Sequence, residues 1–438
     1  MTKPVQVGTG GGAAIGAPLL VAILLLVPGQ AGAALGDCGQ PKTTGSGPTA
    51  ADALEVLRSA VGLSSCGGHD PCVCDVDSSG TVVAGDALRV LKKAVGQPVV
   101  LDCPCNVTTT TTTTTSSSTL PPVSSTELFL MVKSQGSYAT ADLQGTWDGS
   151  AIATGPSAPA WLRATLAFQS SGSFSGDFTY SNGSPDTISG KLAVASGGVL
   201  TCTQNCPSSF RGALDSGKSV LVATDTSDDS SSEFYVLARR GASYAQSDLA
   251  GTWNVADMVS GPSGPNWLRG PTTIQSGGAF DATSKDAYGT VRHATGTFTL
   301  SGIGHVTCPA PACTSSFRGS LDTGKTVMVA TQTRGDGSAE FLVMTKRGAS
   351  YSQDDLAGSW QFQSIVAGDD EPLWARGAVS ISASGVLSGT IKDSNGGNGN
   401  VGGTMTIDSD GLARISGAAG LLCALDSGKT VLACTDTR

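Results

Sequence analysis

From Glu127 onward the sequence repeats itself three times, and this repeat limits the fold more than any other feature. Glu127, Glu233 and Glu340 open the copies at intervals of 106 and 107 residues. A copy of about 100 residues is long enough to bury a core of its own. We therefore expect three complete units, at 127–226, 233–333 and 339–438.

Two tryptophans in each copy stay in register, and together they account for all 6 Trp of the chain. The first set is Trp147, Trp253 and Trp360, and the second set is Trp161, Trp267 and Trp374. Within a copy, apolar residues recur at every second position, as in the run Phe174, Gly176, Phe178 and Tyr180. This is the period of a β-strand.

Short strands separated by Gly, Ser and Asp turns predict a small antiparallel barrel or sandwich for each copy. With 59 Gly and 14% charged residues, the composition favours such turns over long helices. Helix is expected only briefly, near 141–143 and its equivalents. The predicted fold class is thus mainly β, with three tandem units. In an alternative arrangement 128–133 pairs with the last unit, and the three copies then close into one ring.

The N-terminal segment 1–33 has the pattern of a secretory signal peptide. Lys3 precedes the apolar run 13–27, and Ala31-Gly32-Ala33 supplies small residues for cleavage. The run of 15 residues is shorter than the roughly 20 that span a bilayer. We expect a secreted or cell-surface protein with no membrane span after cleavage. A membrane anchor is the alternative interpretation.

All 12 Cys follow the signal, which in an exported protein favours disulfides over free thiols. Six of them lie within 37–105, where the sequence leaves the connectivity open. The other six form three local pairs: Cys202 with Cys206, Cys308 with Cys313, and Cys423 with Cys434. The last pair should face across a hairpin, because both cysteines stand equally far from its tip. A metal site is the alternative for the two short pairs.

The sharpest motif is an acidic loop that runs from Asp75 to Asp86. A calcium loop needs oxygen ligands at positions 1, 3, 5, 7 and 12, and a Gly at position 6 turns the chain. Here those positions hold Asp75, Asp77, Ser79, the Thr81 carbonyl and Asp86, with Gly80 at the turn. A helix should follow, with a buried face made of Leu88, Val90, Leu91 and Val95. A solvated acidic turn is the alternative.

This loop and helix resemble the type I dockerin family, whose EF-hand-like module is a duplicated calcium loop and helix that docks onto a cohesin domain. The duplication is visible here, since 52–57 reads DALEVL and 86–91 reads DALRVL. In the first copy Pro41, Thr43 and Gly45 stand where the second copy has ligands, and only Asp52 remains. We therefore expect a dockerin-like module at 37–105 that binds one Ca²⁺. The resemblance implies a cohesin-like protein domain as its partner.

Segment 106–126 is rich in Thr and Ser, and it is expected to be an extended linker between this module and the repeats. Within the repeats, the Gly-Thr/Ser-Trp that contains each Trp of the first set resembles the Gly-x-Trp of lipocalin-like barrels. In that family such a Trp packs at one end of the core.

Each Trp of the second set is followed two residues later by an Arg. A Trp beside an Arg can form a structural clamp, or it can stack on a sugar ring while the guanidinium donates hydrogen bonds. The candidate ligand-binding residues are therefore Trp161, Arg163, Trp267, Arg269, Trp374 and Arg376.

Charge and histidine content exclude some classes of function. With 35 acidic and 26 basic residues, the net charge of −9 argues against a nucleic-acid partner. None of the 3 His recurs among the copies, which disfavours a repeated His-based active site. We predict a secreted, non-catalytic protein whose tandem units bind an extracellular ligand such as a polysaccharide, with avidity from repetition. The alternatives are an extracellular polysaccharide hydrolase and a small-ligand-binding barrel.

Overall fold

The computed structural model describes residues 38–43, 47–64, 66, 73–77, 79, 81–97, 99, 101, 103, 123–155, 159–262, 265–368, 373–418 and 420–437. The chain divides into two compact domains, Met1–Ser117 and Ser118–Arg438. We call them the small domain and the large domain and describe each by itself. The predicted signal at 1–33 and most of the predicted linker lie outside the described residues.

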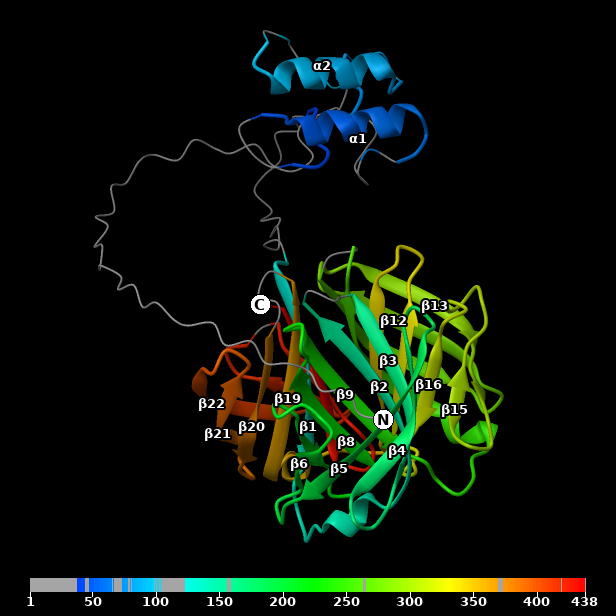
Figure 1. Cartoon of the computed structure of the whole chain (residues 1–438), viewed down its shortest axis with the longest axis vertical. Helices are drawn as coiled ribbons and strands as arrows, with labels where there is room; N and C mark the ends of the chain where they lie inside the picture. Colours follow the sequence, from blue (N-terminus) through cyan, green and yellow to red (C-terminus); the bar gives the residue numbers. More distant parts are fainter. Residues whose placement is uncertain are drawn as a thin grey trace, which may run out of the picture. The chain divides into compact units, whose positions relative to one another are not determined.

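In its described part the small domain has two helices, α1 (Ala50–Ala60) and α2 (Ala84–Ala94), drawn in blue in Figure 1. Both helices start in the same way. The Asp52 carboxylate accepts a hydrogen bond from the Thr49 amide, and Asp86 accepts one from the Val83 amide, each at 2.8 Å. The duplicated sequence therefore folds into two equivalent helix starts.

The core of the small domain is narrow and is reinforced by disulfides. Val56 on α1 and Val90 on α2 are both fully buried. Disulfides join Cys38 to Cys103 and Cys66 to Cys74. Cys72 and Cys105 lie outside the described residues.

The strands of the large domain form two closed eight-stranded barrels and one nine-stranded sheet, which we call the first barrel, the third barrel and the middle sheet. Together they are the three lobes. The first barrel contains β2 (Gly145–Thr154), β3 (Ala160–Phe168), β4 (Ser173–Tyr180), β5 (Pro185–Val194), β6 (Val199–Gln204), β7 (Arg211–Leu214), β8 (Val220–Thr226) and β9 (Ser232–Arg239). The middle sheet contains β10 (Gly251–Ser260), β11 (Asn266–Ile274), β12 (Ala279–Asp286), β13 (Val291–Thr297), β14 (Thr299–Leu300), β15 (His305–Thr307), β16 (Arg318–Leu321), β17 (Val327–Thr333) and β18 (Ala339–Lys346). The third barrel contains β1 (Ser125–Lys133), β19 (Gly358–Gly368), β20 (Leu373–Ile381), β21 (Val386–Asp393), β22 (Asn398–Ile407), β23 (Leu412–Ile415), β24 (Leu422–Leu425) and β25 (Val431–Thr437).

Although β1 comes first in the chain, it completes the third barrel (Figure 1). It pairs antiparallel with β19 along its whole length and with β25 on its other edge. In the same way β9 pairs with β2, and β18 pairs with β10. The lobe boundaries therefore lie one strand away from the predicted units 127–226, 233–333 and 339–438. This pairing matches the ring alternative, in which 128–133 joins the last unit.

Each lobe has its own core, which the first Trp set anchors. Trp147, Trp253 and Trp360 are fully buried, as the sequence predicted for core residues. Each indole Nε1 donates to the carbonyl four residues earlier, at Leu143, Leu249 and Leu356, over 2.7–2.8 Å. Those carbonyls lie in or next to the short 3₁₀ helices η3 (Thr140–Leu143), η4 (Gln246–Leu249) and η5 (Gln353–Asp355).

A further core lies between the lobes, where the outer faces of their adjoining strands pack together. Leu128, Phe234 and Phe341 occupy equivalent positions in it and are all fully buried. The rings of Phe234 and Phe341 meet edge to face with their centroids 5.9 Å apart. The shared core explains why β1 is buried on both faces, although a single barrel would bury only one.

The three local cysteine pairs form disulfides, as predicted: Cys202–Cys206, Cys308–Cys313 and Cys423–Cys434. Cys423 and Cys434 are directly paired across β24 and β25, which is the predicted hairpin geometry.

Candidate functional site

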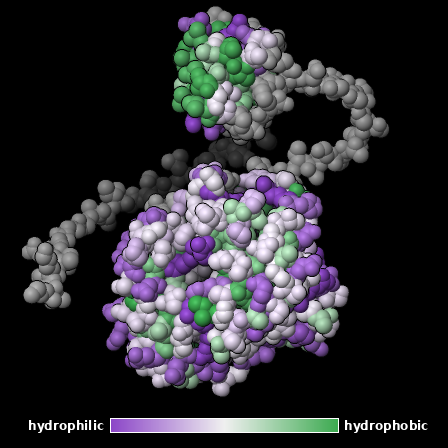
Figure 2. Space-filling model, turned by 90° about the vertical axis from the view of Figure 1, so that its right-hand side faces the viewer, coloured by the Kyte–Doolittle hydropathy of each residue, from purple (hydrophilic) through white to green (hydrophobic). Residues whose placement is uncertain are grey.

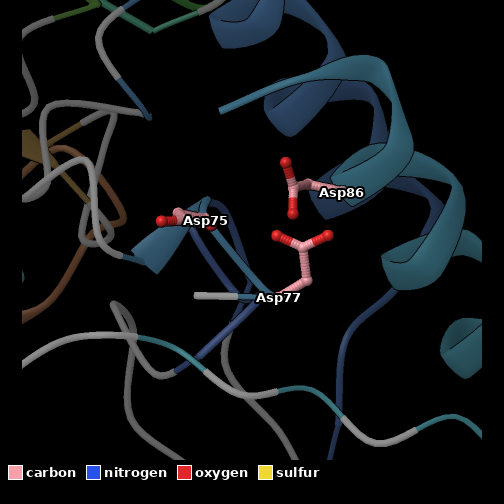
Figure 3. Close-up of side chains that lie close together, drawn as sticks. All are labelled: Asp75, Asp77 and Asp86. Atoms are coloured by element: carbon pink, nitrogen blue, oxygen red, sulfur yellow. The ribbon is translucent and has the colours of Figure 1, made fainter. Parts of the chain in front are cut away.

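The acidic loop of the small domain brings together the carboxylates that the sequence singled out. Ligand oxygens of Asp75, Asp77 and Asp86 lie within 4.8 Å of one another. Figure 3 shows the three side chains close together, with Asp86 at the start of α2. Two oxygens on opposite sides of a calcium ion are about 4.6–5.2 Å apart, twice the usual bond length. The spacing of the three carboxylates therefore suits Ca²⁺.

The other two predicted ligands lie beside these carboxylates. Ser79 Oγ is 3.3 Å from Asp75 Oδ1 and 3.0 Å from the Thr81 carbonyl oxygen. The Ser79 amide donates to Asp75 Oδ1 at 3.0 Å and to Asp77 Oδ1 at 3.2 Å. The loop thus gathers all five predicted ligand positions, while Gly80 lies outside the described residues.

The carboxylates of this loop repel one another. Burial raises the pKa of Asp86, and the negative charges of Asp77 and Asp75 raise it further, against hydrogen bonds from the Val83 and Val76 amides. Arg89 pairs with one of these acids, since its Nε lies 3.7 Å from Asp77 Oδ2. A divalent cation would relieve this repulsion.

In the first loop, hydrogen bonds stabilise the one remaining acid, Asp52. The Asp52 carboxylate accepts hydrogen bonds from the Lys42 and Thr43 amides at 2.9 Å, and from the Thr49 amide at 2.8 Å. The hydroxyls of Thr43 and Thr49 also donate to it. Burial raises the pKa of Asp52, but the hydrogen bonds from Thr43, Thr49 and Lys42 outweigh it and hold this pKa below its ordinary value. Asp52 and Asp86 hold equivalent positions, but Asp86 faces the carboxylates of Asp75 and Asp77.

The two helices also present an apolar face to solvent, and here the sequence prediction was partly wrong. Val90 is buried as predicted, but Leu88, Leu91 and Val95 are 53%, 42% and 66% exposed. The equivalent residues of α1 are exposed too: Leu54, Leu57 and Val61. The sequence period predicted an apolar stripe on the helix but not which of its residues other parts of the chain cover. Because the core of the small domain is small, most of the stripe stays exposed. We call these six residues the apolar face; Figure 2 shows hydrophobic side chains gathered on the small domain.

Among the candidate ligand-binding residues of the repeats, the three tryptophans are buried, while the arginines beside them are partly exposed. Trp161, Trp267 and Trp374 are only 3–4% exposed. Each is stacked under its own Arg, with the guanidinium carbon 3.9–4.0 Å from the ring centroid: Arg163, Arg269 and Arg376. These pairs form the structural clamp that was the alternative interpretation.

Each Trp–Arg pair donates hydrogen bonds to the neighbouring lobe, and the three pairs link the lobes in cyclic order. Trp161 donates to Thr333 Oγ1 of the middle sheet at 2.8 Å. Trp267 donates to Thr437 Oγ1 of the third barrel at 2.9 Å, and Trp374 donates to Thr226 Oγ1 of the first barrel at 2.7 Å. The three arginines donate to backbone carbonyls of the same neighbouring lobe, at Ser316, Gly420 and Ser209. Burial lowers the pKa of Arg163 to about 9.

Sequence reasoning missed one set of polar residues inside the first barrel, Asp225, Glu233 and Tyr235, which line a cavity of about 250 Å³. The only signal was the small size of Gly149 and Ala151, where the other copies have larger or polar residues.

No protein-family model and no curated protein matches this chain. Among solved structures, a protein of unknown function from the DUF3598 family of Nostoc punctiforme is 11% identical; the match covers 48% of this chain and 99% of that one, with a TM-score of 0.20. Transferrin binding protein B from serogroup B Neisseria meningitidis is 10% identical over 70% of this chain and 78% of that one, with a TM-score of 0.19. Scores this low carry no argument about fold or function. In the described part of the chain, no helix is both long enough and apolar enough to cross a membrane.

Proposed function

We propose that this chain is a secreted docking protein in which a calcium-loaded loop orders the small domain for binding to a cohesin-like protein domain. The observation that carries the proposal is the convergence of Asp75, Asp77 and Asp86 at the start of a helix with an exposed apolar side. Calcium would fix the loop against α2 and so set the position of the apolar face.

The apolar face supports a protein partner, because equivalent apolar residues are exposed on both helices. Exposed apolar patches on monomeric domains often mark interaction sites. The large domain is then the part that docking brings to its place of action, attached through the Thr-rich linker. Since the Trp rings of these pairs are buried, the proposal does not include sugar stacking on them.

Calorimetry with CaCl₂ on the signal-free chain tests the calcium site. We expect one site per chain, lost in Asp75→Ala and retained in Asp177→Ala, which removes an exposed acid from the first barrel. Two sites, or one site that survives Asp75→Ala, would contradict the assignment.

A panel of type I cohesin domains tests the docking step separately. Binding should require calcium and should be lost when Leu54 and Leu88 are both replaced by Lys, while the calcium stoichiometry stays at one. If the chain binds calcium but none of the cohesin domains, the calcium site stands and the proposed cohesin-like partner is wrong.

A further inference from the structure

The first barrel is hollow at one end of its interior. At the other end, the fully buried Trp147 closes the barrel. Between this plug and the opposite rim lies the cavity of about 250 Å³. Its walls are mainly apolar and include Leu162, Leu166, Phe178, Ile188 and Leu237.

Two small residues on β2 explain why this barrel has space. Where the first barrel has Gly149 and Ala151, the middle sheet has Val255 and Asp257, and the third barrel has Phe362 and Ser364. A Cβ on Gly149 would lie 3.2 Å from Leu237 Cγ, so a larger side chain here would have to displace Leu237 as well as fill the cavity. In the third barrel Phe362 occupies this place and packs on Phe129 with ring centroids 5.0 Å apart.

Acidic and phenolic side chains line the open end of the cavity. Tyr235 donates its hydroxyl proton to Glu233 Oε2. Asp225 is 1% exposed and accepts hydrogen bonds from the Ser209 hydroxyl and, at 2.7 Å, from the Thr226 amide. The ring of Tyr180 completes this rim.

Glu233 has no ion-pair partner among the described residues, unlike its counterpart in the middle sheet. There, Glu340 Oε2 lies 3.3 Å from Arg334 Nε and accepts a hydrogen bond from Gln332 Nε2 at 2.8 Å. Burial raises the pKa of Glu233, and the charges of Asp225 and Asp229 raise it further, against the Tyr235 hydrogen bond. Arg376 partly offsets the charge of Asp225, so Glu233 is the acid of this cavity that has no cation beside it among the residues that the structure describes.

We propose that this cavity binds a small organic cation, with its ammonium group at Glu233 and its apolar body among the aliphatic and aromatic walls. A half-buried carboxylate gains most from a partner that also displaces water. The faces of Tyr180 and Tyr235 add attraction for a cation.

The volume of the cavity limits the size of the ligand. A cavity of about 150 Å³ holds benzene, and pockets for drug-sized molecules begin near 300 Å³ by the usual estimate of about 300–1,000 Å³. The cavity therefore fits one ring with a short alkylamine chain.

Calorimetry and NMR titration of the signal-free chain with 2-phenylethylamine test the proposal, with 2-phenylethanol as the uncharged probe of similar shape. We expect one amine per chain and at least about tenfold weaker binding of the alcohol. Glu233→Gln should weaken amine binding at least about tenfold and leave alcohol binding nearly unchanged. Glu340→Gln, the matched change in the middle sheet, should leave both unchanged.

Filling the cavity should abolish binding of both probes. Gly149→Phe copies the third barrel, and Ala151→Leu is a second filling variant in case the first one unfolds the barrel. No binding by the natural chain, equal affinity for amine and alcohol, or full binding by a folded filling variant would each overturn the proposal.

Discussion

Trp161 Nε1 donates a 2.8 Å hydrogen bond to Thr333 Oγ1, although 172 residues separate them and they belong to different lobes. The same bond recurs from the middle sheet to the third barrel and from the third barrel to the first. Because each lobe is hydrogen-bonded to the next, the three lobes form a closed ring. The recurrence of the Trp–Arg pair is thus explained by the interfaces between the lobes, without a shared ligand.

The first prediction concerns how much one Trp–Arg clamp contributes to the free energy of unfolding. Arg163→Ala removes a guanidinium that donates to Thr331 Oγ1 and to the Ser316 carbonyl, each at 2.7 Å. We expect a loss of roughly 2–4 kcal/mol in the free energy of unfolding, because buried acceptors lose charged donors. Urea unfolding followed by tryptophan fluorescence measures it. Arg414→Ala is the control: its exposed ion pair with Asp408 should contribute at most about 1 kcal/mol, and equal losses would contradict the clamp.

The second prediction is a pH dependence at the boundary between the first barrel and the middle sheet. Burial raises the pKa of Asp148, but hydrogen bonds from His305, Arg240 and Thr165 outweigh it and hold the pKa below its ordinary 3.8. A carboxyl with a lowered pKa in the folded state stabilises above its ordinary pKa and loses that contribution as pH falls through the lowered value. Asp148→Asn, which copies Asn254 of the middle sheet, should therefore cost about 1–3 kcal/mol at neutral pH.

Urea unfolding of both proteins at pH 7 and at pH 3 checks this prediction. The difference between them should shrink at the lower pH, where the natural carboxyl begins to take up a proton. A difference that stays constant, or grows, as pH falls would refute it.

The sequence predicted the strands well because their period is local, and the intervals between Trp147, Trp253 and Trp360 revealed the repeat. It could not choose the partner of β1, since 127–133, 233–239 and 340–346 are equivalent and any of them can close any lobe. Burial of Trp161 depends on that choice, so its role stayed open as well.

The cavity of the first barrel could not be predicted from the sequence for another reason. A Gly such as Gly149 adds no side chain to a periodic pattern, and only its neighbours in space decide whether the gap is filled.

The third prediction separates the two loops of the small domain. Thr43→Val removes a hydroxyl that donates to Asp52 in the loop that closes without a cation. We expect the small domain to lose about 1–2 kcal/mol while calcium stoichiometry stays unchanged. Thermal unfolding followed by circular dichroism at 222 nm reports this loss, since α1 and α2 are the α-helices of the described chain. Reduced calcium binding in Thr43→Val would mean that the first loop also contributes to the ion site.

The fourth prediction tests the ring closure through β1. Phe129 is 4% exposed, and its ring packs against Phe362 of β19, so its loss should loosen the third barrel. Phe129→Ala should cost about 3–5 kcal/mol, as is usual for a buried aromatic residue. Hydrogen exchange should then speed up in β19 and β20. The matched variant Leu342→Ala, at the equivalent position of β18, should instead speed up exchange in β10 and β11. If Phe129→Ala loosens β2 and β3 of the first barrel, the first strand belongs to the unit that follows it and the ring is open.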